Sequence, residues 1–100
     1  MATATTTREI EMTTTLTRND YLDALVKAAG PRDRMGRIER KRLAACRVGD
    51  RANSVAAWDK AMARVAILAD EYQIHYDAWK AASDEARRIL DIINAQEVAA

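Results

Sequence analysis

The sequence predicts an all-α protein, a small helical bundle of three to four helices preceded by a threonine-rich N-terminal arm. Glycine and proline are scarce, with three Gly and one Pro in 100 residues, and Ala, Arg and acidic residues are abundant, a composition that favours helix over strand. Apolar residues also recur at seven-residue spacing through the second half of the chain, as in bundle helices. Because this length suits one domain, we expect an arm over residues 1–17 and a bundle domain over 18–100.

The N-terminal arm has a biased composition, since eight of the residues 1–17 are threonine. Threonine is β-branched and resists helix formation. One interpretation is an arm without fixed structure. The other is a strand that orders on the edge of a partner's sheet, with Ile10 and Met12 on one face.

The first helix is expected over about residues 18–29, and its start is well marked. Thr17 is a good N-cap, and Asp20 three residues later completes a short capping box. Leu16 before the cap and Tyr21 in the first turn form a hydrophobic staple. The Gly-Pro dipeptide that follows is expected to end this helix.

The second helix is expected over about residues 33–48, with Gly49 as its stop. Glu39 and Arg42 fall inside its apolar arc; they could pair with each other, or Arg42 could send its charged head outward. Most other cations of the segment point away from that arc and form a basic surface, which is either a partner-binding site or a solvated face that keeps the protein soluble. The candidate partner-binding residues are Arg34, Arg37, Arg40, Lys41, Arg47 and Arg51.

The remainder of the chain is expected to form helices at about 52–81 and 84–97, or one long kinked helix. Ser83 and the acids after it suit a new helix start. The apolar stripe is wide enough to face two neighbouring helices, and its aromatic residues suit a bundle better than a tight parallel pair, so we expect a monomer. The seven-residue repeat consists of Val55, Trp58, Met62, Val65, Ala69, Tyr72, Tyr76, Trp79, Ala86, Leu90 and Ile93.

Charge is distributed unevenly behind a net charge of +1. Residues 32–51 contain eight basic side chains against three acidic ones, whereas residues 65–100 contain three basic against seven acidic. Any electrostatic partner is therefore expected to meet the 32–51 segment.

Chemistry-bearing residues are few, and we expect neither catalysis nor a cofactor or metal. His75 lies beside the tyrosines of the apolar stripe, and we interpret it as a histidine at the edge of the core. We interpret the single Cys46 as a packing residue. We expect no metal site, because the sequence has only one His and one Cys. No apolar run reaches the length of a membrane span, and no signal peptide begins the chain, so we expect a cytoplasmic protein that contacts no membrane.

A helix-turn-helix DNA-binding regulator of phage or mobile-element genes is the alternative function. The stretch LAACRVGDRANSVAAW over residues 43–58 places a small residue, a turn glycine and two apolar residues at the spacing of that motif. It departs from the motif at Asp50, where an apolar residue is usual, and at Asp59, which would repel phosphate. Direct nucleic-acid binding is therefore the lesser expectation.

The whole chain resembles the small phage and prophage proteins that disable host defence, and in particular the anti-CRISPR proteins. The resemblance is carried by its size, the start MATATTTREIEMTTTLT and the Ala/Arg/Asp-rich body RMGRIERKRLAACRVGDRANSVAAWDKAMARVAILADEY, without a signature motif. It implies a non-enzymatic inhibitor that binds a Cas protein subunit of a bacterial type I surveillance complex and blocks recruitment of target DNA in the host cytoplasm. Contact through Arg side chains would suit such a partner.

Overall fold

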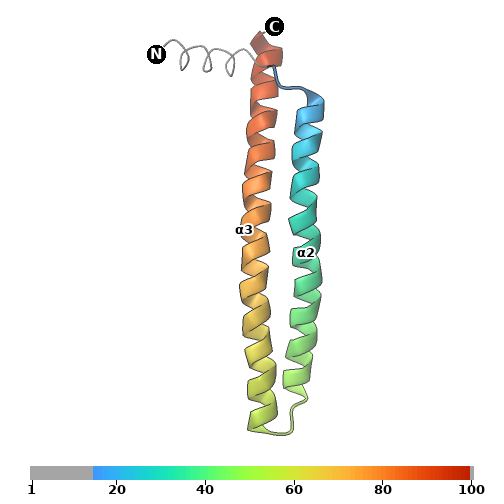
Figure 1. Cartoon of the computed structure of the whole chain (residues 1–100), viewed down its shortest axis with the longest axis vertical. Coiled ribbons are helices and arrows are strands. Elements are labelled where there is room, and N and C mark those ends of the chain that lie inside the picture. The colour runs from blue at the N-terminus through green and yellow to red at the C-terminus, as the bar shows by residue number, and fades with distance from the viewer. Residues whose placement is uncertain (1–14, 100) are drawn as a thin grey trace, which may run out of the picture.

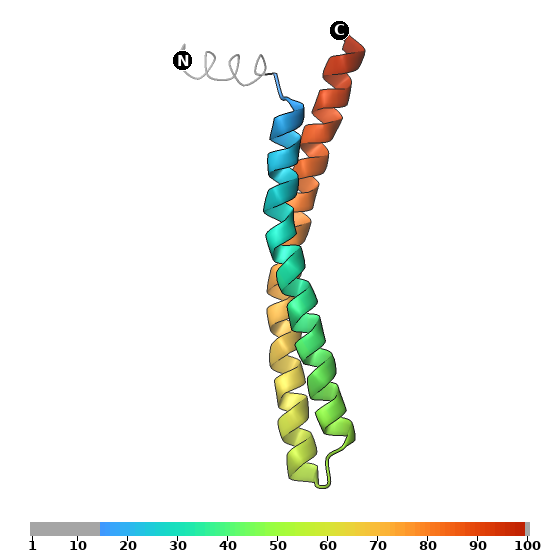
Figure 2. The same cartoon turned by 90° about the vertical axis from the view of Figure 1, so that its right-hand side faces the viewer.

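The computed structural model of the chain describes residues 15–99 as a hairpin of two long antiparallel helices (Figure 1). Helix α2 spans Arg18–Asp50, and α3 spans Val55–Ala99. The helices lie side by side and cross about halfway along their length (Figure 2). The all-α prediction is confirmed, but the bundle of three to four helices is wrong, because the described residues form two. The expectations for the N-terminal arm fall mainly on residues 1–14, outside the described part of the chain.

The start of α2 agrees with the capping box expected from the sequence. The Thr17 hydroxyl accepts a hydrogen bond from the Asp20 backbone N–H at 3.3 Å, and the Asp20 carboxylate accepts one from the Thr17 backbone N–H at 2.7 Å. Leu16 and Tyr21 both pack against the apolar cluster next to this end of the helix. This capping satisfies backbone donors that would otherwise lack partners.

The predicted helix end at residues 30–31 is wrong, because α2 passes through Gly30 and Pro31 without interruption. A proline ring disfavours helical backbone in the preceding residue by clashing with its Cβ. Gly30 has no Cβ, so this clash does not arise. Pro31 is also buried against α3, and tertiary packing of this kind offsets the hydrogen bond that proline cannot donate. The two helices predicted before residue 49 are therefore one.

Gly49 lies close to the end of α2, as expected, but it acts through packing. The residue is buried inside the last helical turn, the helix ends at Asp50, and no glycine in the described residues has a positive φ. A Cβ atom at Gly49 would lie 2.6 Å from the terminal methyl group of Met62 and 3.5 Å from the Cβ of Ala61. The missing side chain thus lets α3 approach α2 closely beside the loop.

Helix α3 begins with a cap at Ser54, whose hydroxyl accepts a hydrogen bond from the Ala57 backbone N–H at 3.1 Å. It then continues without the break expected at 81–87. Charged side chains one turn apart span that segment and support an unbroken helix. The ion pairs are Lys80–Asp84 at 3.2 Å, Arg87–Asp91 at 3.3 Å and Glu85–Arg88.

The seam between α2 and α3 consists mainly of small residues. Two apolar clusters occupy it, one around Ala24 and Ala86 near the chain termini and one around Ile38 and Leu68 nearer the loop. At the open end, the Gln96 side-chain amide accepts from the Leu16 N–H at 3.1 Å and donates to the Leu16 carbonyl at 2.9 Å. The buried hydrophobic residues are Ala24, Ala28, Ile38, Ala45, Ala61, Leu68, Ala86 and Ile89.

Half of the predicted seam of α3 meets α2, because Ala86 is buried and Val65, Tyr72 and Ile93 pack against the two clusters. The other half is displaced by one helical position. Ala61, Leu68 and Ile89 are buried against α2, whereas Val55, the first predicted member, is 75% exposed and Trp58 is 50% exposed. The predicted stripe is real, but only part of its width meets α2. The remainder lies on the flank of the hairpin.

Replacement of Thr17 by Ala is expected to lower the free energy of unfolding by about 1 kcal/mol, because it removes the N-cap acceptor. Chemical denaturation followed by circular dichroism measures the change. Thr15→Ala is the matched control, since Thr15 is exposed and precedes the cap. Equal losses in the two variants would contradict the capping role.

Ala86→Leu is expected to destabilise the hairpin by about 1–3 kcal/mol, because a larger side chain overpacks a closely spaced seam. Ala86 is 2% exposed and belongs to the cluster that joins α2 and α3. The control Ala81→Leu makes the same change on α3 at an exposed position. Thermal and urea unfolding of both variants test the prediction, which fails if Ala86→Leu is as stable as the control.

Candidate functional site

The six candidate cations from the sequence are all exposed, five of them on α2 and Arg51 directly after it. Helical spacing places Arg37, Arg40 and Arg47 on the side turned away from α3, and Arg34 and Lys41 on the flank next to it. The structure therefore brings them together as one basic surface. Arg34 stands at its margin, where its Nε donates a hydrogen bond to Nδ1 of His75 on α3 at 3.4 Å. The basic surface consists of Arg34, Arg37, Arg40, Lys41, Arg47 and Arg51.

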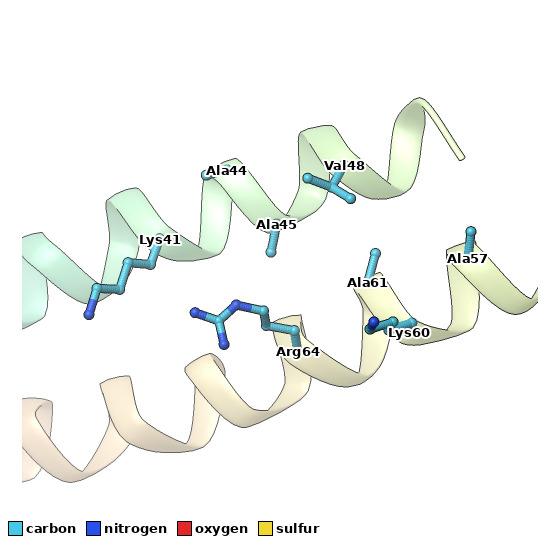
Figure 3. Close-up of a pocket in the computed structure, with 8 residues that line it drawn as sticks. All are labelled: Lys41, Ala44, Ala45, Val48, Ala57, Lys60, Ala61 and Arg64. Atoms are coloured by element: carbon cyan, nitrogen blue, oxygen red, sulfur yellow. The ribbon is translucent and has the colours of Figure 1, made fainter. Parts of the chain in front are cut away.

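Beside the loop, the basic surface adjoins a groove between α2 and α3 with a volume of about 470 Å³ (Figure 3). Its floor is apolar and is made of alanine methyl groups and Val48. Three cations border it, Lys41 from α2 and Lys60 and Arg64 from α3. We call this feature the cationic groove. Its lining residues are Lys41, Ala44, Ala45, Val48, Ala57, Lys60, Ala61 and Arg64.

The sequence identified only one of the cations that border the groove. Lys41 belongs to the Arg-rich segment, whereas Lys60 and Arg64 lie in the next helix among alanines. They meet because the short connection folds α3 back along α2, which places residues near 61 opposite residues near 49. A prediction of two antiparallel helices would have given this pairing of residues, and with it the position of Lys60 and Arg64 near Lys41.

Electrostatics distinguish the two ends of the hairpin. The loop half, residues 34–76, has nine basic and five acidic side chains, a net charge of +4. The terminal half, residues 15–33 and 77–99, has six basic and eight acidic side chains, a net charge of −2. The groove lining contains cations but no carboxylate, so an anionic group of a partner is attracted to this end.

Two ion pairs fix charged side chains elsewhere on the surface. Arg42 Nε donates to Glu39 Oε2 at 3.0 Å, which settles how these two residues are accommodated at the apolar margin, and Arg88 Nε donates to Glu85 Oε2 at 2.9 Å. The hydrogen bond from Arg42 lowers the pKa of Glu39, and that from Arg88 lowers the pKa of Glu85, below the usual value of 4.5. These carboxylates are therefore engaged within the chain.

The groups available at the groove suit binding. Ammonium and guanidinium groups donate hydrogen bonds to carboxylates or phosphates, and the methyl-lined floor accepts apolar side chains. Among residues 15–99, His, Cys, Asp and Glu do not gather in groups of three at metal-binding distance. Neither described helix combines the length and apolar content needed to cross a membrane. Cys46 is half-buried.

The arrangement of the 43–58 segment differs from a helix-turn-helix. In that motif the two helices cross at roughly 90–120°, whereas α2 and α3 run antiparallel along their whole contact (Figure 1). The helix that would read bases begins at Val55 and continues to Ala99. The turn after Gly49, over residues 51–54, thus belongs to a helical hairpin.

Comparison with known proteins identified no relative: no protein-family model, curated protein or solved structure matches this chain.

The ion pairs predict how stability depends on pH. Because folding lowers the pKa values of Glu39 and Glu85, their contribution is complete above the unfolded value near 4.5 and is lost as the pH falls through the lower folded values. We expect the free energy of unfolding to decrease on acidification below about pH 5. In the double variant Glu39→Gln, Glu85→Gln this decrease should be smaller, as measured by urea unfolding at a series of pH values. An unchanged pH dependence in this variant would contradict the assignment.

Proposed function

We propose that this protein acts without catalysis, by stoichiometric binding of a partner protein through the cationic groove and the adjoining basic surface. The observation that carries the proposal is the combination of an apolar floor with three bordering cations, Lys41, Lys60 and Arg64. Such a groove fits a segment in which an aliphatic side chain and a carboxylate lie close together.

A protein segment fits this groove better than a nucleic-acid backbone does. Apolar atoms of a partner that cover Val48, Ala57 and Ala61 would contribute favourable free energy by removing apolar surface from water. A phosphate backbone has few such atoms. Arg and Lys form charge-assisted hydrogen bonds with the carboxylates of a protein surface.

The anti-CRISPR resemblance supplies the partner to test first. It implies a Cas protein subunit of a bacterial type I surveillance complex, with block of target DNA recruitment as the consequence of binding. The groove supports this choice, because its three cations suit an acidic patch on such a subunit.

Charge reversal in the groove tests the proposal. The double variant Lys41→Glu, Arg64→Glu is expected to weaken capture of a purified type I surveillance complex at least tenfold, because two favourable contacts become repulsive. Immobilised protein and surface plasmon resonance measure the affinity. The matched control, Lys27→Glu, Arg88→Glu, makes the same charge change at exposed cations of the terminal half and should bind as the native protein does.

A parallel titration with random duplex DNA over a range of salt concentrations separates the two kinds of partner. Tight, steeply salt-dependent DNA binding that the groove variant loses would overturn the proposal in favour of nucleic-acid binding. Failure of the native protein to bind any Cas subunit would remove the named partner. Equal binding by the groove variant and the control would remove the groove as the site.

A further inference from the structure

The apolar surface of the hairpin exceeds what its two helices cover. Five of the eight buried hydrophobic residues are alanines, and no large side chain in the described residues is fully buried. Meanwhile the apolar stripe of α3 is wide enough for two helical neighbours, and α2 provides one. Because so few large side chains are buried, the hairpin gains little stability from its own core, and association would add to it.

Four of the exposed large apolar residues, Leu22, Leu25, Leu43 and Val55, lie on one broad side of the hairpin, whereas Val48, Ile67 and Ile74 lie towards the other side. Leu22 and Leu90 line a shared cleft there near the termini. Positions seven residues apart lie on the same side of a helix, so the series that contain Leu22 in α2 and Leu90 in α3 continue along this side towards the loop. The cationic groove opens on the opposite side, where Lys41 and Arg64 lie. We call the first side the apolar face; it includes Leu22, Leu25, Ala29, Leu43, Cys46, Val55, Met62, Ala69, Tyr76 and Leu90.

We propose that a second copy of this chain covers the apolar face, forming a four-helix bundle in which the two loops lie at opposite ends. This proposal replaces the expectation of a monomer, which assumed that the chain itself would supply three or four helices. It does not depend on the proposed function, because the groove and the apolar face lie on opposite sides of the hairpin.

Charge along the apolar face favours one orientation of the second copy. Lys80, Arg87 and Glu39 lie there but are paired within the chain with Asp84, Asp91 and Arg42. Among the others, Arg18 lies at the terminal end of α2 and Asp50 at its loop end. Loops at opposite ends bring Arg18 of each copy towards Asp50 of the other, whereas loops at the same end would oppose like charges.

The distribution of side-chain size agrees with that orientation. On α2 the leucines Leu22 and Leu43 lie near the two ends of the face, and the small residues Ala29 and Gly36 lie between them. When the two copies run in opposite directions, Leu22 of each copy lies near Leu43 of the other. The small residues of the two copies then meet at the centre of the interface. Tyr76 lies at the middle of the α3 series, 5.7 Å between ring centroids from Trp79, so the bulk of α3 lies beside the small residues of α2.

The available area is sufficient for a stable dimer. The 33 residues of α2 span about 50 Å, and two helices side by side are about 20 Å wide, so the face offers about 1,000 Å² per copy. A standard interface needs about 800 Å² per partner. The resulting bundle would present two cationic grooves, one at each end, and so be bivalent towards its partner.

Light scattering during size-exclusion chromatography of the full chain tests the proposal. The chain has a mass of 11.2 kDa, and we expect light scattering to give twice that mass for the native protein at micromolar concentration. Leu43→Glu, which places a charge in the apolar face, should elute at 11.2 kDa. The matched control Val26→Glu alters a more exposed residue, 72% against 45%, outside the face and should remain dimeric. A native mass of 11.2 kDa overturns the proposal, and so does a dimeric Leu43→Glu variant.

Cross-linking with a short bis-maleimide tests the orientation without depending on the folding of the Leu43 variant. With loops at opposite ends, the two Cys46 residues lie about 40 Å apart, so the native dimer should not cross-link. In Arg32→Cys, Cys46→Ser the new cysteines lie near the centre, and we expect a cross-linked dimer. Cross-linking through Cys46 would contradict the proposed orientation of the two copies. A dimer that does not cross-link at residue 32 would contradict the apolar face as the dimer interface.

Discussion

The narrow seam of small side chains between α2 and α3 is the constraint on which the rest of this structure depends. Alanine at Ala24, Ala45, Ala61 and Ala86, with Gly49 beside the loop, lets two backbones approach closely over a long contact. Alanine also buries little apolar area, so this contact contributes a modest hydrophobic stabilisation per residue. The helices depend in addition on their caps and on ion pairs one turn apart, such as Lys80–Asp84.

Sequence analysis predicted the features that local chemistry decides. The capping box at Thr17 and Asp20 involves neighbours in sequence, so it could be identified without the fold. The Gly-Pro dipeptide was misread because its usual meaning depends on context. At positions 30–31 the glycine removes a steric clash and the proline is buried against α3, and both effects require knowledge of the partner helix. The same holds for the break expected near Ser83, where side-chain pairs stabilise a continuous helix.

The candidate site likewise has a part that could be predicted from one helix and a part that could not. The exposure of Arg37, Arg40 and Arg47 followed from their position off the apolar arc of a single helix. The cationic groove did not, because Lys60 and Arg64 join Lys41 only through the antiparallel register of two helices. Composition pointed to the Arg-rich segment of α2 and gave no sign of Lys60 and Arg64 in α3.

The displacement of the α3 seam explains how a correct periodicity led to the wrong number of helices. The repeat that includes Met62, Tyr76 and Leu90 is apolar and helical, and a stripe of that width implies two neighbours for α3. It carries no information on whether those neighbours belong to the same chain. Among residues 15–99, α2 is one of these neighbours, and Val55, 75% exposed, lies on the side that α2 leaves uncovered. Since the cationic groove opens on the opposite side, covering the apolar flank would stabilise the hairpin and leave its basic end accessible to a partner.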